Sequence, residues 1–372
     1  MKQITDWHKG SKYISPLSPA CKMCKEGEKM VLLVTGLCPS DCFYCPLSFE
    51  KRNKDRIFAD EWELNDEEDT EKLFLEANYI ESKGAGITGG DPLVVWGRTQ
   101  RYIEFLKDKF GSNYHIHLYT SGIKNHEHIK DLVSAGLDEI RFHPSYVHWD
   151  KMSQSQIKKA ILSSLDLDVD VAIEIPAIPN MEKQILDLIN WSDKQNIRWL
   201  NLNELEFSET NADALNFKKY NVKNDISSAV KNSEETAYQV IDKCVIKDLD
   251  IGVHYCSSSF KDGMQLRNRI KRRARNISKK HEIITEDGTI LKGIILANSD
   301  YTIEGLFTII KNKKLVNKKD IYLNKDQNRL ELSVKKIREI SPYLKKLSLE
   351  YYIIEEYPTA DHLEVERIPL FS

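Results

Sequence analysis

Long hydrophobic runs are missing from this sequence. The longest ones, residues 30–34 and 294–297, are far shorter than the roughly 20 apolar residues that a membrane-spanning helix needs. The first ten residues are polar and lack the apolar core of a secretory signal. We therefore expect a cytoplasmic protein that does not enter a membrane.

A strong charge of either sign is also missing. Lysine and arginine number 54 against 57 aspartates and glutamates, which gives a net charge of −3. The surface as a whole therefore does not indicate binding to nucleic acid or membranes. With 41% hydrophobic and 30% charged residues, the composition is that of a globular protein. A chain of 372 residues is long enough for about two domains.

The cysteines do not fit a disulfide framework. There are seven, an odd number, in a long chain without a secretory signal. Five of the seven lie between positions 21 and 45. Such a cluster in a reducing compartment indicates metal binding.

Short apolar runs alternate with amphipathic stretches from about residue 30 to residue 256. The runs predict strands at residues 30–37, 86–88, 115–120, 139–143, 169–175, 197–202 and 251–255. Apolar spacings of three and four predict helices at residues 67–81, 99–110, 126–135 and 181–194.

Strands that alternate with helices pair in parallel through right-handed crossovers. We therefore predict an α/β fold, a partial or complete (β/α) barrel over residues 30–256, preceded by an N-terminal arm over residues 1–29. In such barrels the active site forms at the carboxyl ends of the strands.

The sequence changes character after residue 256. Residues 267–280 hold eight basic residues and no acidic one, and residues 257–281 are predicted to form a basic helical linker. Beyond it, residues 281–296 predict a hairpin that turns at Asp287-Gly288. With two further helical stretches and a strand at 349–354, residues 282–372 predict a small α+β domain.

The basic stretch 267–280 has three interpretations. It can be a solvated helix between domains, a phosphate-binding surface for RNA, or a binding site for an acidic protein or an anionic substrate. Aromatic residues, which would favour the stacking of single-stranded bases, are absent from it.

Cys38, Cys42 and Cys45 form the most specific motif of the chain, with the spacing C-x3-C-x2-C directly after a predicted strand. Three thiolates on one short loop can hold one face of an iron–sulfur cubane. Without a fourth thiolate, one iron stays open to a ligand, as in catalytic metal sites. Zinc usually takes pairs of cysteines that lie far apart in sequence. We therefore predict that these three cysteines are metal ligands and catalytic.

This segment resembles the C-x3-C-x-aromatic-C signature of the radical S-adenosylmethionine (SAM) superfamily, with Tyr44 as the aromatic residue. The resemblance implies a [4Fe–4S] cluster whose open iron binds SAM. It also implies reductive cleavage of SAM to methionine and a 5′-deoxyadenosyl radical, which abstracts a hydrogen from a substrate. Within the superfamily, three further segments make the chain resemble archaeal-type relatives of pyruvate formate-lyase activating enzyme: Cys21-Lys22-Met23-Cys24, His254-Tyr255-Cys256 and Tyr357-Pro358-Thr359-Ala360-Asp361.

A second landmark of the superfamily, a Gly-Gly-Glu-Pro-like turn, corresponds here to Gly89, Gly90, Asp91 and Pro92. The resemblance implies that this turn binds the amino group of SAM; the aspartate departs from the usual glutamate. Further cofactor-binding candidates end later strands and would contact the ribose or amino-acid part of SAM: Ser121, Glu174 and Asn203.

Three other cysteines can form an auxiliary metal site, with zinc or a second cluster. Cys21 and Cys24 are spaced C-x2-C, and Cys256 ends a predicted strand with His254 two residues before it. The N-terminal arm is long enough to fold back over the catalytic rim and bring these cysteines together. The alternative is an unliganded pair with Cys256 in the core. Cys244 is predicted to pack in a helix.

Three hypotheses follow for the whole protein. The first is a radical SAM enzyme acting on RNA or protein, with the basic stretch 267–280 as a binding surface. The second is a radical SAM enzyme acting on a small metabolite, and the third is a non-enzymatic zinc or iron–sulfur binding protein. For an enzyme, the resemblance implies a low-potential electron donor such as a ferredoxin- or flavodoxin-like protein.

Overall fold

The computed structural model describes residues 2–371, apart from the side chain of Lys318. The chain forms two compact units, of which the first ends at Leu266 and the second begins at Arg267. The division falls inside residues 257–281, so the basic stretch belongs to the second unit and does not form a separate linker. Within residues 2–371, no helix has the length and apolar character needed to cross a membrane.

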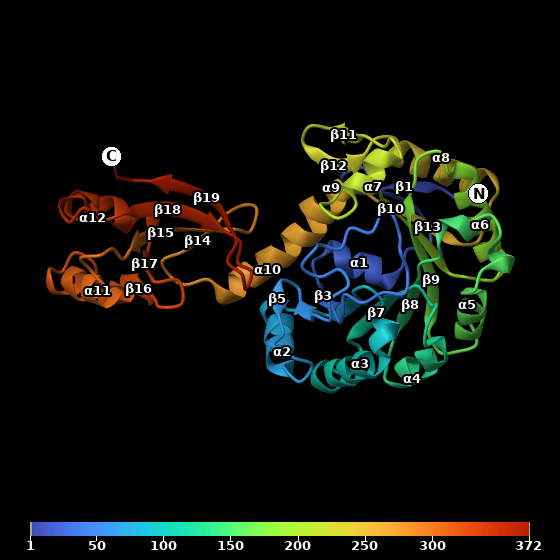
Figure 1. The fold of residues 1–372 in the computed structure, drawn as a ribbon, viewed down its shortest axis with the longest axis horizontal. Helices are drawn as coiled ribbons and strands as arrows, with labels where there is room; N and C mark the ends of the chain where they lie inside the picture. The colour runs from blue at the N-terminus through green and yellow to red at the C-terminus, as the bar shows by residue number, and fades with distance from the viewer. Residues whose placement is uncertain (1, 372) are drawn as a thin grey trace. The chain divides into compact units, whose positions relative to one another are not determined.

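Seven parallel strands form the centre of the first unit (Figure 1). In sheet order they are β3 (Lys29–Leu33), β6 (Gly84–Thr88), β7 (His115–Thr120), β8 (Glu139–Phe142), β9 (Asp170–Ala177), β10 (Trp199–Glu204) and β13 (Gly252–Cys256). Each one corresponds to a strand that the sequence predicts, and the parallel pairing is confirmed. Their carboxyl ends therefore share one side of the unit.

Short antiparallel strands border this sheet on both sides. β4 (Phe58–Ala59) and β5 (Trp62–Glu63) follow β3, whereas β2 (Lys12–Ile14) and β1 (Ile4–Asp6) follow β13. β1 and β5 are the two edges of the sheet as the structure describes it. The barrel is thus partial, one of the two forms that the sequence allows.

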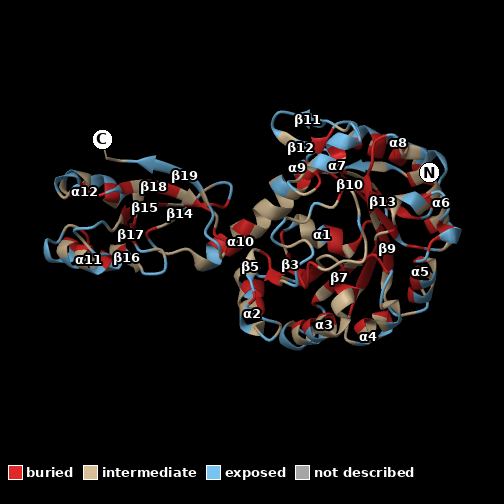
Figure 2. Ribbon diagram, viewed as in Figure 1, coloured by how far each residue is buried: buried red, intermediate tan, exposed pale blue. Residues whose placement is uncertain are grey.

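Amphipathic helices cover the outside of the curved sheet (Figure 1). In α3, for example, Tyr102, Ile103 and Leu106 are buried at helical spacing, and Figure 2 shows the buried strands inside this layer. The helices are α2 (Thr70–Tyr79), α3 (Trp96–Phe110), α4 (Ile129–Ser134), α5 (Lys158–Ser164), α6 (Glu182–Lys194) and α8 (Ser233–Ile246). Shorter elements are η1 (Pro92–Val95), η2 (His126–His128), η3 (Tyr146–His148), η4 (Met152–Gln154), α7 (Ala212–Phe217), β11 (Val222–Asn224), β12 (Ser227–Val230), α9 (Ser258–Phe260) and η5 (Lys261–Leu266).

One helix, α1 (Pro19–Lys25), lies inside the ring of strands (Figure 1). Ser18 caps it by accepting a hydrogen bond from the backbone N–H of Ala20 (3.1 Å). The Ser18 hydroxyl also donates to Glu139, the first residue of β8 (2.7 Å). The helix therefore enters from the amino ends of the strands. The sequence allows the segment with Cys21 and Cys24 to fold back over the catalytic rim. In the structure this segment instead lies inside the partial barrel.

The second unit has its own core and an antiparallel sheet in the order β16-β17-β15-β18-β19, with β14 beside β15. Gly288, with φ +92°, makes the predicted turn between β14 and β15. The elements are α10 (Arg267–Ile277), β14 (Ile283–Ile284), β15 (Ile290–Leu296), α11 (Ile303–Asn312), η6 (Lys318–Asp320), β16 (Ile321–Asn324), β17 (Arg329–Leu332), α12 (Val334–Lys346), β18 (Tyr351–Glu356) and β19 (Glu364–Pro369).

Candidate active site

The cysteine loop, which carries Cys38, Cys42 and Cys45, follows the carboxyl end of β3. Its backbone turns tightly, since the N–H of Cys45 donates to the carbonyl of Cys42 (3.0 Å). The N–H of Ser40 donates to the sulfur of Cys38 (3.4 Å). All three cysteines are half-buried and line one cavity of about 950 Å³. The fold therefore collects the three thiols at the side where active sites of such barrels form.

The three thiols fit an iron–sulfur cubane. Burial raises the pKa of Cys42 to about 11, so thiolates here need a cation, and metal binding would release protons. A cubane can take each of the three thiolates on a separate iron, and the missing fourth thiolate leaves one iron open to a ligand.

The turn after β6 fastens the start of the cysteine loop. The N–H of Gly90 donates to the carbonyl of Thr35, and that of Asp91 to the carbonyl of Leu37 (2.8 Å each). A Cβ added at Gly90 would lie 2.2 Å from the Leu37 oxygen. One at Gly89, whose φ is +148°, would lie 2.2 Å from the Thr35 oxygen. Both glycines line the cavity, and they let two backbones meet.

Asp91 points away from the cavity. Its buried carboxylate accepts hydrogen bonds from the Thr120 hydroxyl (2.7 Å) and from the N–H groups of Leu93 (3.0 Å) and Ser121 (3.1 Å). The Ser121 hydroxyl also donates to it. Burial raises its pKa, and these hydrogen bonds oppose the rise. Asp91 thus differs from the expected cofactor contact, because protein donors surround it, whereas Ser121 lines the cavity.

Glu174 presents an ionised carboxylate to the cavity. It pairs with Arg141 (2.6 Å) and accepts hydrogen bonds from the amides of Asn201 (3.0 Å) and Asn203 (2.7 Å). Burial by itself raises the pKa of Glu174, but Arg141 and the two amides lower it below the usual value. Of these residues, Glu174 and Asn203 line the cavity, as the sequence predicts for strand ends in a barrel.

Tyr44 is held in place by His143 at the end of β8. Nδ1 of His143 lies 2.7 Å from the carbonyl oxygen of Glu174, so this nitrogen carries the proton. Nε2 therefore accepts the hydrogen bond of the Tyr44 hydroxyl (2.9 Å). Burial lowers the pKa of His143 and raises that of Tyr44, so both groups are neutral. The sequence places His143 at a strand end but does not single it out as a site residue.

Lys261 and Glu206 are site residues that the sequence does not reveal. Their side chains form an ion pair (2.7 Å), and both line the cavity. Burial lowers the pKa of Lys261, but Glu206 and Cys256 raise it above the usual value. Glu206 lies just past the end of a predicted strand, and this position could have identified it as a candidate site residue. No motif marks Lys261.

The other cysteines lie deeper than the cavity lining. Cys21 and Cys256 are buried and Cys24 is half-buried. None of the three lines the cavity of the cysteine loop. The sulfur of Cys21 lies 3.4 Å from Nη2 of Arg141, and Arg141 also pairs with Glu174. α1 therefore contacts the hydrogen-bond network of Glu174. Cys244 packs in the core, as expected.

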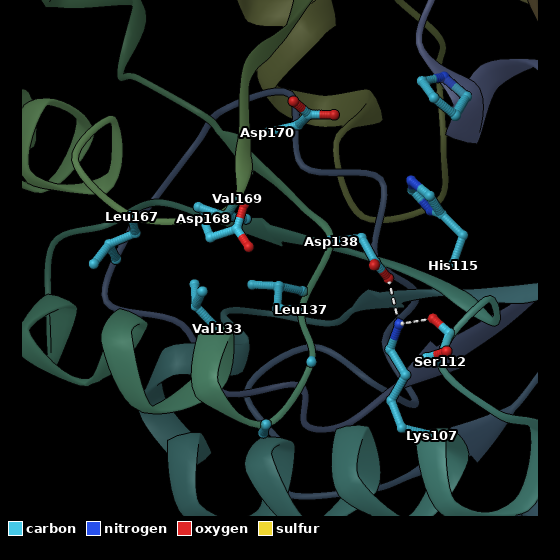
Figure 3. A pocket seen from close by; sticks show the side chains of 13 residues that line it. Lys107, Ser112, His115, Val133, Leu137, Asp138, Leu167, Asp168, Val169 and Asp170 are labelled. Carbon is cyan, nitrogen blue, oxygen red and sulfur yellow. Dashed lines mark hydrogen bonds and ion pairs between the residues drawn. The ribbon is translucent and has the colours of Figure 1, made fainter.

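A second cavity, of about 760 Å³, opens at the amino ends of the strands. Figure 3 shows Lys107 crossing it to the Asp138 carboxylate and the Ser112 carbonyl oxygen (2.9 Å each). His115 and Asp170, which begin β7 and β9, also line it. Because chemistry in such barrels takes place at the opposite ends of the strands, we assign the active site to the cavity of the cysteine loop.

Comparisons with known proteins bear on the same segments. Residues 32–191 match the family model of the radical SAM superfamily, and residues 288–370 match a domain of unknown function, DUF8061. A protein of Methanocaldococcus jannaschii, whose name gives it as a candidate glycyl-radical enzyme activating enzyme, is 40% identical over 364 residues. This alignment covers 96% of the chain and 93% of the relative.

Solved structures give weaker likenesses. The structure of anSMEcpe with bound AdoMet is 13% identical with a TM-score of 0.42 and covers 60% of each chain. The radical SAM methyltransferase TsrM from Kitasatospora setae, with tryptophan and a SAM analog bound, is 9% identical with a TM-score of 0.37. It covers 52% of this chain and 39% of that one.

The sequence relative, at 40% identity over nearly the whole chain, is close enough to establish kinship. The family model spans the cysteine loop, the glycine turn and the strands up to β9. This membership implies a [4Fe–4S] cluster and SAM, which agrees with the donor set of the cavity. The chain is therefore an enzyme of the radical SAM superfamily and belongs to the same family as its Methanocaldococcus relative.

Proposed function

We propose that this enzyme binds a [4Fe–4S] cluster through Cys38, Cys42 and Cys45 and cleaves SAM reductively, so that a hydrogen can be abstracted from a protein substrate. One observation carries the proposal. The three thiols and the Gly89-Gly90 turn line a single cavity, at the carboxyl ends of the strands, that is large enough for a nucleoside cofactor.

When bound, the cluster and SAM supply an electron and a 5′-deoxyadenosyl radical. The residues of the chain bind and orient the cofactor. Ser121, Glu174 and Asn203 offer hydroxyl, carboxylate and amide groups to the ribose or amino-acid part of SAM. Asp91 acts indirectly, because it orients Ser121 by accepting its hydrogen bonds.

Tyr44 lines the same cavity, and His143 fixes its hydroxyl. Since Tyr44 stands between Cys42 and Cys45 in the sequence, this hydrogen bond also restrains the loop that holds the cluster. His143 is thus a positioning residue of the proposed site.

A protein substrate is favoured by the name of the relative, which describes an enzyme that activates a glycyl-radical enzyme. Such a reaction acts on a polypeptide and needs a reductant, for which a ferredoxin- or flavodoxin-like protein is the chemical class we propose. The basic stretch does not favour RNA. Arg267 and Lys279 pair with Asp287 (3.0 Å) and Glu331 (3.5 Å), and Arg273 is buried.

A small-metabolite substrate stays a hypothesis, and an auxiliary zinc ion or cluster at Cys21, Cys24 and Cys256 stays a prediction. The substrate classes can be separated by testing which cell fraction stimulates 5′-deoxyadenosine formation. We expect a macromolecular fraction to do so, and protease treatment to remove the effect. Stimulation that survives protease but not ribonuclease would identify RNA, and stimulation by the low-molecular-weight fraction would identify a metabolite.

The cluster site is tested with Cys42→Ala. Purified without oxygen, the unaltered protein should have the brown colour of an iron–sulfur protein. After reduction with dithionite, it should release methionine and 5′-deoxyadenosine from SAM. Cys42→Ala should abolish this cleavage. Cys244→Ala, which changes a buried cysteine of α8 away from the cavity, should retain it. Cleavage by Cys42→Ala, or a colourless zinc protein, would refute the proposal.

A further inference from the structure

We propose that Asn211 and Thr210 are positioning residues, which hold the cysteine loop in its cluster-binding conformation before any metal binds. Both lie in the segment that follows β10, residues 206–220. The inference rests on the proposed function, because that function makes the cysteine loop the ligand of the cluster. It adds that the loop depends on a segment far away in the sequence.

Asn211 is fully buried, and each polar atom of its side chain has a partner. The amide nitrogen donates to the carbonyl oxygens of Tyr44 (3.2 Å) and Glu206 (3.0 Å). The amide oxygen accepts a hydrogen bond from the N–H of Ser208 (2.8 Å). Two carbonyls on one side and an N–H on the other fix the orientation of the amide. The contacts therefore need a side chain that both donates and accepts.

The position of Asn211 would ordinarily give it a different role. It directly precedes α7, where asparagine commonly caps a helix with its side chain. Here the side chain makes no cap. It contacts the cysteine loop instead, 167 residues earlier in the chain. The side chain thus serves a long-range contact and not the start of its own helix.

The peptide between Tyr44 and Cys45 is held at both of its polar groups. Its carbonyl accepts the hydrogen bond of Asn211. Its N–H, which belongs to Cys45, donates to the carbonyl of Cys42 (3.0 Å). The plane of a peptide held in this way cannot rotate without breaking a hydrogen bond. Asn211 therefore fixes the turn that joins two of the three cysteines.

Thr210 holds the next peptide. Pro46 has no N–H, so the carbonyl of Cys45 is the only hydrogen-bonding group of that peptide. This carbonyl accepts a hydrogen bond from the Thr210 hydroxyl (3.1 Å). Further along the loop, the N–H of Phe49 donates to the carboxylate of Glu209 (3.0 Å). The segment after β10 thus contacts the cysteine loop at successive points.

Ring contacts of the same segment reach Phe43. The ammonium of Lys218 lies 4.6 Å from the centre of the Phe43 ring, and the ring of Tyr220 is parallel to it at 6.4 Å. Lys218 is exposed, and cation–π contacts are weak at exposed positions. We therefore assign the positioning role to the buried Asn211 and to Thr210.

A loop that is ordered before the metal arrives binds it more tightly. Ordering a free loop costs conformational entropy, which would oppose binding. The turn after β6 holds the start of the loop at the carbonyls of Thr35 and Leu37. The segment after β10 holds its end at the carbonyls of Tyr44 and Cys45. With both ends held, little of this cost is left to the cluster.

Amide hydrogen exchange of the metal-free full chain tests this role without the cluster. In Asn211→Ala, we expect residues 38–45 to exchange about tenfold faster, because a lost buried hydrogen bond lets the loop open. Asn216→Ala, at an exposed position of α7, is the matched control and should exchange like the unaltered protein. Unchanged exchange in Asn211→Ala, or faster exchange over the whole chain, would overturn the proposal.

Thr210→Val is the second variant and decides if Asn211→Ala does not fold. It keeps the branched shape and removes the hydroxyl that donates to Cys45, so residues 38–45 should again exchange faster. Thr210→Ser keeps a hydroxyl and should restore the rate of the unaltered protein. Equal exchange in Thr210→Val and Thr210→Ser would then count against the proposal.

Reconstitution with iron and sulfide links the role to the proposed function. Contacts that orient metal ligands typically contribute about 10- to 100-fold to metal affinity. Asn211→Ala should therefore hold much less iron than Asn216→Ala at equal, limiting iron, and full iron in Asn211→Ala would overturn the proposal. If the unaltered chain binds no cluster, the proposed function fails, whereas the exchange of the metal-free proteins still decides on Asn211.

Discussion

At the residue scale, Asp91 joins two strand ends with a single carboxylate. It accepts hydrogen bonds from Leu93 in its own turn and from Thr120 and Ser121 after β7. Asp91 therefore ties the turn after β6 to the end of β7 and fixes the orientation of Ser121.

Asp91→Asn should destabilise the fold, because it replaces one acceptor oxygen with an NH2 group. This donor would face N–H and O–H groups that are themselves donors. We expect the free energy of unfolding to fall by about 1–3 kcal/mol, measured by urea titration with circular dichroism. Asp108→Asn, at an exposed position in α3, is the matched control and should change little. Equal stability of the two variants would contradict the role given to Asp91.

Glu174→Gln should weaken the protein most at neutral pH, because it leaves the buried Arg141 with Glu139 as its remaining anionic partner. We expect a loss of about 3–5 kcal/mol. The pKa of Glu174 is lowered on folding, so its stabilisation is complete above its unfolded pKa of about 4.3 and disappears as the pH falls below it.

Unfolding of the two proteins should therefore be compared from pH 3 to pH 7. The difference between Glu174→Gln and the unaltered chain should shrink toward the acid end. Glu235→Gln, at an exposed position of α8, should follow the unaltered protein throughout. A difference that does not depend on pH would rule out the ionised carboxylate.

At the element scale, the glycine turn after β6 is in close backbone contact with the start of the cysteine loop. Gly90→Ala would place a Cβ 2.2 Å from the backbone oxygen of Leu37, and backbone cannot yield as a flexible side chain does. We expect at least a twofold drop in iron content. Gly97→Ala meets nothing within 4 Å and should keep full iron and gain up to about 1 kcal/mol of stability. Full iron in Gly90→Ala would contradict this account.

The strands of the second unit share a buried charge network around Lys292. Its ammonium lies 3.0 Å from Glu282, 3.3 Å from Glu331 and 2.6 Å from Glu356. Ligand atoms of His281, Glu282 and Glu331 also lie within 4.8 Å of one another. Because lysine already neutralises these carboxylates, we do not assign a metal site here.

Lys292→Met should destabilise the second unit by about 3–5 kcal/mol at pH 7, since it leaves buried carboxylates without their cationic partner. Against burial, His362 and Lys292 lower the pKa of Glu356 to about 2, so its stabilisation is present above its unfolded pKa and lost toward pH 2. The cost of the variant should therefore decrease in acid. Lys335→Met, at an exposed position of α12, should change little at any pH, as thermal unfolding would report.

At the scale of the whole molecule, two units with separate hydrophobic cores carry two separate family matches, residues 32–191 and 288–370. The chemistry resides in the first unit. The second unit begins with the basic helix α10, which buries Ile270, Arg273 and Ala274. The basic stretch is thus partly a structural element of that unit and not a free arm.

We expect no tight binding of single-stranded RNA at 150 mM salt, as measured by filter binding with a mixed-sequence oligonucleotide. A phosphate-binding surface would bind at low salt and lose affinity steeply as salt rises, with a slope near −0.7 for each neutralised phosphate. Such a slope, abolished by replacing Lys271, Arg275 and Lys280 with glutamine, would restore RNA as the substrate class.

Patterns within short segments determined the fold class and the centre of the site. The alternation of apolar runs with amphipathic stretches depends on local spacing, and so does the C-x3-C-x2-C motif. The glycine turn was recognisable because its order after the motif is fixed by the chain. These features follow from neighbours in sequence, which is why the strands and the cysteine loop were predictable.

Only the tertiary structure decided which distant groups meet. Cys21 contacts Asn201, 180 residues away, because α1 enters the partial barrel from the amino ends of the strands. No local pattern encodes that path, nor the pairing of Lys261 with Glu206 or the orientation of Asp91. Each of these contacts depends on the curvature of the sheet and on the packing of the interior. The spacing of residues within a short segment does not determine either one.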